Sequence, residues 1–314
     1  MPATMRAIRQ QAFGGPEVLQ LTEVERPVPL PTEVLVRVRA AGVNPVEAVI
    51  RSGRFPLLGE PPFILGWDVC GVVEDIEPGV TRFQPGDEVY GMPFFPRAAG
   101  AYAEYVAAPS RQLARKPAGL SHAEAAALPL AGLTAWQALV DTAQVTAGQQ
   151  VLIHGAGGGV GHLAVQIAKA RGAHVIGTAS AVKHDFVASL GADELIDYRA
   201  TDFAAHVSGV DVVLDTIGGD TALRSIGVLR PGGLLVTIVG RRDFDLAART
   251  EAAGRFFAGV SVEPDYPALE ALAALADSGQ LRVHLQVSLS LAEAVKAHEL
   301  LESGSVTGKI ALTV

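Results

Sequence analysis

Residues 151–180 constrain the fold of this chain more than any other stretch. They open with the apolar run Val-Leu-Ile at 151–153, which is too short for a helix and suits a strand buried on both faces. A glycine cluster follows, then an apolar helical pattern that ends near Gly172, then a second apolar run at 174–176. Strand, glycine turn, helix and strand within about thirty residues predict a βαβ unit.

The glycine turn inside this unit has the chemistry of a phosphate cradle. Counted back from Gly161 it reads Ala156-x-Gly158-x-x-Gly161, with alanine where the dinucleotide fingerprint usually has its first glycine. Glycine lets the backbone approach a pyrophosphate, and the helix N-terminus attracts its charge. A plain structural turn is the alternative, but the flanking elements favour a dinucleotide site. Its expected backbone contacts are Gly157, Gly158, Gly159 and Val160.

Composition limits the partners and cofactors. The 314 residues are enough for two domains, and a net charge of −8 argues against nucleic acid or an anionic membrane as the main partner. The single cysteine, Cys70, excludes an internal disulfide and a multi-cysteine zinc site. The first residues lack the apolar segment of a signal peptide, and the most apolar run, 125–140, is broken by Pro129 and Gly132 and is too short to span a bilayer. We therefore expect a cytoplasmic protein.

The first part of the chain is rich in expected strands. Residues 33–39 alternate valine with other residues, which is the pattern of a half-buried strand. Pro-Gly turns at 78–79 and 85–86 separate further short strands, which predicts a small barrel or sandwich. The pattern changes at Ser121, because Ser121 and Glu124 form a capping-box sequence before an alanine-rich helical run.

The βαβ unit continues into a doubly wound domain. Further apolar strands are expected at 194–197, 210–215, 234–238 and 260–262. A helix with leucines at 269, 272 and 275 follows, and a last helix starts at a capping box of Ser290 and Glu293 and ends near Gly304. Residues 309–314 alternate like a strand that returns to the first domain.

The order of these motifs resembles the medium-chain dehydrogenase/reductase superfamily along the whole chain, and within it the zinc-independent quinone oxidoreductase and enoyl reductase branch. The resemblance is carried by AAGVNPVEAVIRSG (40–53), GVTRFQPGDEVYG (79–91), LPLAGLTAWQAL (128–139), the glycine turn, LGADELIDYR (190–199), LDTIGG (214–219) and the C-terminal SGSVTGKIALTV. It implies an α/β protein with a GroES-like, β-rich catalytic domain (1–122 and 259–314) and a doubly wound Rossmann domain that binds NADP (123–258). It also implies a homodimer.

The residues at the family's metal positions do not match zinc ligands. Zinc members hold the metal with Cys, His and Cys, whereas Asn44 stands where the first ligand would be and Trp67-Asp68 stands where a His-Glu pair would be. We therefore expect no metal. Cys70 lies in the apolar run 69–73, where a small buried hydrophobe is a better interpretation than a nucleophile.

The end of the second Rossmann strand indicates which nicotinamide binds. NAD enzymes usually place an acid there for the ribose 2′-hydroxyl, but Thr178, Ala179 and Ser180 are uncharged and Lys183 follows. A carboxylate 4 Å from a 2′-phosphate would repel it by about 4 kcal/mol per pair of unit charges, so its absence favours NADPH. The resemblance implies that Ser180, Lys183 and Tyr198 bind this phosphate. The alternative for Lys183 is a solvated charge at a helix start.

The resemblance also implies the reaction. In this branch the nicotinamide delivers hydride to a quinone or to a C=C conjugated with a carbonyl, and such acceptors need less electrophilic help than a simple ketone. Asn44 and Thr134 are the expected catalytic and cofactor-contacting side chains; their alternatives are an Asx-turn and a hydroxyl bonded to its own helix. Related reductases often carry a proton-donating Tyr where this chain has Phe55, so we expect the proton to come from water.

The remaining expected site residues flank the cofactor and the substrate. Asp215, Ile238 and Val260 are expected to contact the cofactor, although Asp215 could only cap the turn after its strand. Phe55, Trp67 and Phe94 are expected to line a hydrophobic pocket for an enone, cyclic enones included, or a quinone. The alternative to an NADPH-dependent reductase is an NADPH-binding protein with a sensing or structural role and no robust turnover.

Overall fold

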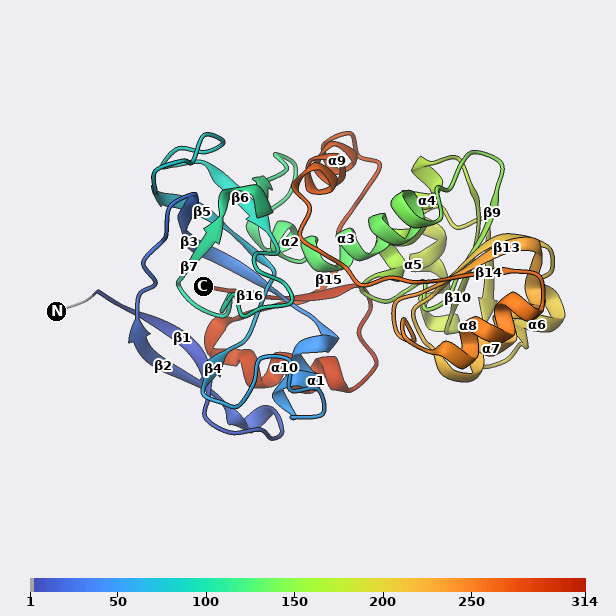
Figure 1. Cartoon of the computed structure of the whole chain (residues 1–314), viewed down its shortest axis with the longest axis horizontal. Helices are drawn as coiled ribbons and strands as arrows, with labels where there is room; N and C mark the ends of the chain where they lie inside the picture. The colour runs from blue at the N-terminus through green and yellow to red at the C-terminus, as the bar shows by residue number, and fades with distance from the viewer. Residues whose placement is uncertain (1–2) are drawn as a thin grey trace. The chain divides into compact units, whose positions relative to one another are not determined.

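The computed structural model describes residues 3–314, and the chain divides into two compact units (Figure 1). The first contains residues up to Leu133 together with Glu263–Gly279 and Val283–Val314. The second contains Thr134–Val262 and Gln280–Arg282. Helix α2 (His122–Ala126) packs on the strands of the first unit.

Strands dominate the first unit. Its larger, seven-stranded sheet has the order β15-β16-β3-β5-β6-β8, and β7 also pairs with β3. A separate three-stranded sheet has the order β2-β1-β4. The strands are β1 (Thr4–Gln10), β2 (Leu19–Glu25), β3 (Glu33–Val43), β4 (Phe63–Ile64), β5 (Val69–Ile76), β6 (Glu88–Gly91), β7 (Tyr105–Pro109), β8 (Leu113–Arg115), β15 (Leu285–Ser290) and β16 (Lys309–Thr313).

Strand β3 shows the expected alternation and receives the end of the chain. Val36 and Val38 are buried and Arg37 is exposed, because successive side chains of a strand point to opposite faces. Strand β16 pairs antiparallel with β3, with Ile310 opposite Val43. This confirms the predicted returning strand.

Short helices accompany these sheets. The capping box of Ser121 and Glu124 forms as predicted at the start of α2, and Ser290 and Glu293 form the second one. In Figure 1, α10 (red) lies beside α1 (blue), two helices from opposite ends of the sequence. The helices are α1 (Pro45–Arg51), α2, α9 (Tyr266–Asp277) and α10 (Ala294–Glu302), with 3-10 turns η1 (Pro16–Val18), η2 (Ser110–Gln112) and η5 (Leu291–Glu293).

The second unit is a doubly wound α/β domain, as expected. All strands of its six-stranded sheet are parallel, and their order β11-β10-β9-β12-β13-β14 is that of a dinucleotide-binding fold. The strands are β9 (Gln150–Ile153), β10 (His174–Ala179), β11 (Glu194–Asp197), β12 (Val210–Asp215), β13 (Leu229–Thr237) and β14 (Phe256–Gly259).

The position predicted for the sixth strand was wrong. Strand β14 ends at Gly259, and residues 260–262 have no strand structure. The register explains the shift: Gly259 pairs with Thr237, the last residue of β13, so β14 has no partner strand to continue along.

Helices cover this sheet and supply the rest of its core. One cluster of buried side chains joins Leu152, Val213 and Leu235 of the sheet to Phe203 and Leu246 of two helices. Figure 1 shows α7 and α8 (orange) side by side against the sheet. The helices are α4 (Gly161–Ala170), α5 (His184–Ser189), α6 (Phe203–His206), α7 (Gly219–Val228) and α8 (Phe244–Ala252), with the 3-10 turn η4 (Ala181–Lys183). Helix α3 (Pro129–Trp136) runs into the π-helical segment η3 (Gln137–Thr142).

No helix within residues 3–314 is both long enough and apolar enough to cross a membrane.

Candidate functional site

The glycine turn between β9 and α4 has a backbone path that only glycine allows. Gly155 has φ of 65°, in the left-handed region. A Cβ on Gly161 would lie 2.1 Å from the carbonyl oxygen of Gly155, so the backbone could not pass there with a side chain. Helix α4 begins at Gly161, directly after the turn, so the positive end of its dipole faces the turn. The predicted strand, turn and helix are confirmed, and this turn fits a pyrophosphate.

The end of β10 carries the residues expected near the adenosine ribose. Thr178, Ala179 and Ser180 are all buried. The side chain of Lys183 lies over the glycine turn, since a Cβ on Gly157 would come within 2.8 Å of the lysine Cδ. Burial, and then the positive charge of Arg199, lower the pKa of Lys183.

Tyr198 follows the neighbouring strand on the same edge of the sheet. Strands β10 and β11 are parallel, with Ala179 opposite Asp197, so Ser180 and Tyr198 each follow directly after a strand end. Tyr198 is 54% exposed. The segments that carry Ser180 and Tyr198 therefore lie at the same edge of the sheet, and their role in phosphate binding stays a prediction.

His154 and His162, which flank the turn, serve the structure. The His154 ring bonds the hydroxyls of Thr178 (3.1 Å) and Ser225 (2.9 Å), and burial lowers its pKa to about 4, so the ring is neutral. His162 Nδ1 bonds the carbonyl oxygen of Gly158 at 2.9 Å. The His154 ring thus links β10 to α7, and the His162 ring links the turn to the first residues of α4.

Asp215 caps the turn after β12. Its Oδ1 accepts from the N–H groups of Ile217 (3.0 Å) and Gly218 (2.8 Å), and its Oδ2 accepts from the hydroxyl of Thr237 (2.7 Å). The backbone N–H of Ile238 donates to the Asp215 carbonyl oxygen at 3.1 Å, and Val260 N–H donates to Thr237 at 2.9 Å. These bonds tie together the carboxyl ends of β12, β13 and β14.

Asn44, in the first unit, is held by two charged side chains. It precedes α1, and its backbone N–H donates to Glu47 Oε2 at 2.8 Å. Its carboxamide Nδ2 donates to Asp68 Oδ2 at 2.9 Å, and its Oδ1 accepts from the ammonium of Lys309. The side chain thus bonds both Asp68 and Lys309, and only 1% of Asn44 is exposed.

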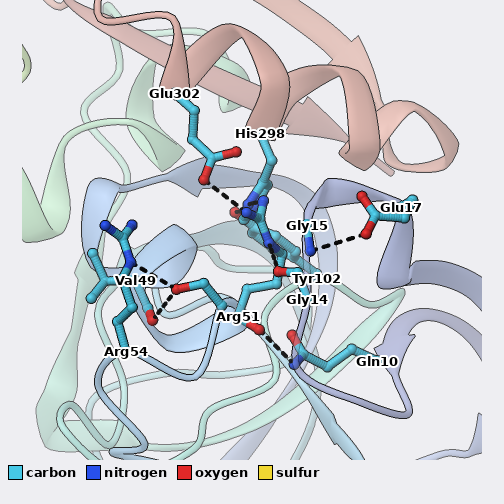
Figure 2. Close-up of polar contacts among 11 residues, drawn as sticks. Gln10, Gly14, Gly15, Glu17, Val49, Arg51, Arg54, Tyr102, His298 and Glu302 are labelled. Atoms are coloured by element: carbon cyan, nitrogen blue, oxygen red, sulfur yellow. Dashed lines mark hydrogen bonds and ion pairs between the residues drawn. The ribbon is translucent and has the colours of Figure 1, made fainter.

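A buried chain of polar groups begins at Glu47. The Tyr102 hydroxyl donates to Glu47 Oε2 at 2.6 Å and lies 3.3 Å from Nε2 of His298. Arg51 donates to Nδ1 of His298 at 3.1 Å and to Glu302 at 2.7 Å, and Figure 2 shows its guanidinium between these two side chains. Burial raises the pKa of Glu47 to about 7.

The sequence did not indicate this chain of contacts. Glu47 and Arg51 lie one helical turn apart in a segment already singled out, which was the available signal. Tyr102 and His298 come from distant segments, and no local pattern pairs them.

The aromatic residues expected at the substrate differ in exposure. Phe55 is 39% exposed and Phe94 is partly buried. Trp67 is 1% exposed, its indole N–H donates to the carbonyl oxygen of Arg97 at 2.6 Å, and its ring meets Phe95 edge-on. Thr134, in the second unit, is 5% exposed.

The residues present do not fit a zinc ion. Among residues 3–314, no three His, Cys, Asp or Glu side chains gather as metal ligands would. Cys70 is fully buried in β5, and burial raises the pKa of its thiol, which disfavours the thiolate that zinc requires. The Lys309 ammonium on Asn44 would also repel a cation at that position.

Comparison with known proteins gives a consistent result over the whole chain. The model of the alcohol dehydrogenase GroES-like domain matches residues 30–118, and a model described as zinc-binding dehydrogenase matches residues 190–312. The quinone oxidoreductases of Homo sapiens and Sus scrofa are 34% and 35% identical, each over 98% of this chain and 97% of the relative.

Solved structures agree with this. The quinone oxidoreductase from Coxiella burnetii has a TM-score of 0.94 and 37% identity, over 99% of this chain and 100% of that one. A mycobacterial protein solved in complex with NADPH has a TM-score of 0.88 and 32% identity, over 99% of this chain and 100% of that one. The expected GroES-like and Rossmann fold class is confirmed. This chain therefore belongs to the medium-chain dehydrogenase/reductase superfamily, as an oxidoreductase of its zinc-independent quinone oxidoreductase branch.

Proposed function

We propose that this protein is an NADPH-dependent reductase that transfers hydride to quinones or to the C=C of α,β-unsaturated ketones, cyclic enones included, without a metal. The family implies a nicotinamide cofactor, and the relatives named quinone oxidoreductase support the acceptor class. The observation that carries NADPH over NADH is the Lys183 side chain beside the glycine turn, with no carboxylate at the end of β10.

The second unit would hold most of the cofactor. Gly157, Gly159 and Val160 would bind the pyrophosphate through backbone N–H groups. The Gly158 N–H donates to the Gly155 carbonyl oxygen at 2.9 Å, so Gly158 would contribute by letting the backbone approach the phosphates closely. Ser180, Lys183 and Tyr198 would bind the 2′-phosphate, and Thr178 and Ala179 would leave room for the ribose because they are small. Asp215, Ile238 and Val260 would shape the site mainly through backbone, since the Asp215 carboxylate is already bonded within the protein.

The reaction would depend on how the protein positions the nicotinamide and the acceptor relative to each other. The reduced nicotinamide supplies the hydride when it is bound. Asn44 and Thr134 would orient the nicotinamide riboside or the acceptor carbonyl, where negative charge develops. Phe55 and Phe94 would contact an apolar acceptor, and Trp67 would support them by packing, because almost none of its surface is exposed. Phe55 has no proton to donate, so water would protonate the product.

NADPH oxidation tests this function. We expect purified protein treated with a chelator to oxidise NADPH when simple quinones or cyclic enones are added, and to oxidise NADH more slowly. Tight NADPH binding without turnover on any of these acceptors would support the sensing or structural role instead. Zinc-dependent turnover would contradict a metal-free reaction.

The proposal includes a homodimer in the cytoplasm. Light scattering in solution should give about twice the 32.6 kDa of one chain. Cell fractionation tests the location.

A further inference from the structure

We infer that Lys309 and Asp68 are positioning residues that fix the carboxamide of Asn44 in a single orientation for hydride transfer. This inference rests on the proposed function, in which Asn44 contacts the nicotinamide or the acceptor.

The fold brings these groups together through strand register. Strand β16 pairs antiparallel with β3, and Ile310 lies opposite Val43. The residue before Ile310 therefore lies beside the residue after Val43. The Lys309 ammonium donates to the Val43 carbonyl oxygen at 2.9 Å and to Asn44 Oδ1, although Asn44 lies 265 positions earlier in the chain.

The chemistry of the two partners sets the orientation of the carboxamide. An ammonium group only donates hydrogen bonds, so the Asn44 atom that faces Lys309 must be the oxygen. A carboxylate only accepts, so the atom 2.9 Å from Asp68 Oδ2 must be the nitrogen. A flipped amide would place donor against donor and acceptor against acceptor. One N–H of Asn44 then remains for a ligand.

Burying the Lys309–Asp68 pair costs desolvation free energy, so its presence in the interior suggests a further role. Lys309 is 3% exposed and Asp68 is fully buried, and their charged atoms lie 3.8 Å apart. Asp68 Oδ1 also accepts from the Leu130 N–H at 2.7 Å, so both carboxylate oxygens are bonded. Well-packed apolar residues often replace buried ion pairs without loss of stability, and the best-attested reason to keep charges inside is that they specify one arrangement.

The pair also alters Asn44 as a hydrogen-bond donor. A positive charge on the amide oxygen draws electron density from the nitrogen, and hydrogen bonds in such a chain strengthen one another. The remaining N–H of Asn44 is therefore both oriented and polarised. A donor fixed before the reaction is what stabilises charge on an acceptor carbonyl oxygen.

The test uses the Asn44 amide itself, so it does not depend on turnover. The reporter is the side-chain NH₂ pair of Asn44, assigned by NMR through its loss in Asn44→Ala. The probe variant is Asp68→Asn/Lys309→Met, which removes both charges together and so avoids leaving one ion buried alone. The control is Lys296→Met, which breaks an exposed ion pair of α10 (3.5 Å to Glu293).

We expect the wild type and the control to show two separate, slowly exchanging Asn44 amide protons. In the double variant, both Asn44 amide resonances should shift and the two protons should exchange at least about tenfold faster, because the charged partners Asp68 and Lys309 are gone. Unchanged resonances and exchange in the double variant would overturn the inference, even if the protein is an active reductase.

Kinetics give the second readout. As a single substitution, Lys309→Met should lower kcat by about tenfold or more and change the KM for NADPH little. Lys309→Arg, which keeps a positive charge, should lower kcat less. In the Asn44→Ala background, Lys309→Met should have no further effect on kcat, because Lys309 acts through Asn44. Additive losses in the two backgrounds would contradict the inference. Absence of turnover in the wild type would instead count against the proposed function and leave the NMR result to decide the inference.

Discussion

Arg51 donates to Nδ1 of His298 at 3.1 Å, deep in the first unit, and this contact sets the state of the imidazole. A guanidinium cannot accept a hydrogen bond, so Nδ1 carries no proton and the ring proton lies on Nε2, toward the Tyr102 hydroxyl at 3.3 Å. Burial, and then the Arg51 charge, lower the pKa of His298 to about 3. The ring is therefore neutral at physiological pH.

This neutrality predicts a loss of stability in acid. Unfolded His298 takes up a proton near its ordinary pKa of 6.5, whereas the folded ring does so only near a pKa of about 3. Between these values the unfolded state binds more protons, so the free energy of unfolding should fall by about 1.4 kcal/mol per pH unit as pH decreases. His298→Gln, which can still accept from Arg51 and donate to Tyr102, should flatten this slope in urea unfolding. Equal slopes in variant and wild type would contradict the assignment. His154 contributes in the same direction and remains in both proteins.

The raised pKa of Glu47 predicts the opposite pH dependence of stability. Burial raises its pKa from 4.5 to about 7, so between these values the folded state holds a proton that the unfolded state releases. Stability should therefore fall by about 1.4 kcal/mol per unit as pH rises through this window, and the contribution is fully lost above the folded pKa.

Substitution isolates this contribution. Glu47→Gln keeps an oxygen that can accept hydrogen bonds from the Tyr102 hydroxyl and the Asn44 N–H, but it cannot ionise. The variant should therefore lose the fall in stability with rising pH and be more stable than wild type above neutral pH. Glu251→Gln, on the exposed face of α8, is the control. The measurement is the denaturation midpoint at a series of pH values. A variant less stable than wild type in mild alkali would contradict the raised pKa.

Two glycine-to-alanine substitutions should have opposite effects. In Gly161→Ala the new Cβ would lie 2.1 Å from the Gly155 carbonyl oxygen and 2.8 Å from Ala156 Cα, so the turn must move. We expect lower stability and loss of NADPH binding by fluorescence titration. Gly227→Ala meets nothing within 4 Å in α7 and should gain up to about 1 kcal/mol, because alanine favours helix, with NADPH affinity unchanged. Normal NADPH affinity in Gly161→Ala would show that the turn is not the pyrophosphate site.

Lys183→Ala should separate the two nicotinamide cofactors. Loss of the cation should raise the KM for NADPH by about tenfold or more and change that for NADH little, because only NADPH carries the 2′-phosphate. Lys169→Ala, which breaks an ion pair with Asp193 (2.8 Å) elsewhere in the same unit, is the matched control. An equal effect of Lys183→Ala on both cofactors would refute the phosphate role.

The sequence predicted what depends on local pattern and little of what depends on distant pairing. The glycine turn, the capping boxes at Ser121 and Ser290, and the returning strand at 309–314 were all recognisable, because each has its own periodicity or spacing. The sixth Rossmann strand was misplaced because its end is set by β13, the strand beside it.

The surroundings of Asn44 were beyond prediction for the same reason. Asn44 is a predicted site residue, but its partners lie far from it in the sequence: Asp68 directly precedes β5 and Lys309 begins β16, and both strands reach Asn44 through their pairing with β3. The chain from Glu47 through Tyr102 to His298 likewise joins three separate segments.

An anaerobic single-turnover reaction tests metal-free reduction by NADPH most directly. Chelator-treated protein would be mixed with stoichiometric NADPH and a simple quinone, and the absorbance of the reduced nicotinamide would be followed, with NADH in a parallel reaction. We predict full oxidation of NADPH, faster than that of NADH, with no change when zinc is added. No oxidation of NADPH, or oxidation that appears only with zinc, would contradict it.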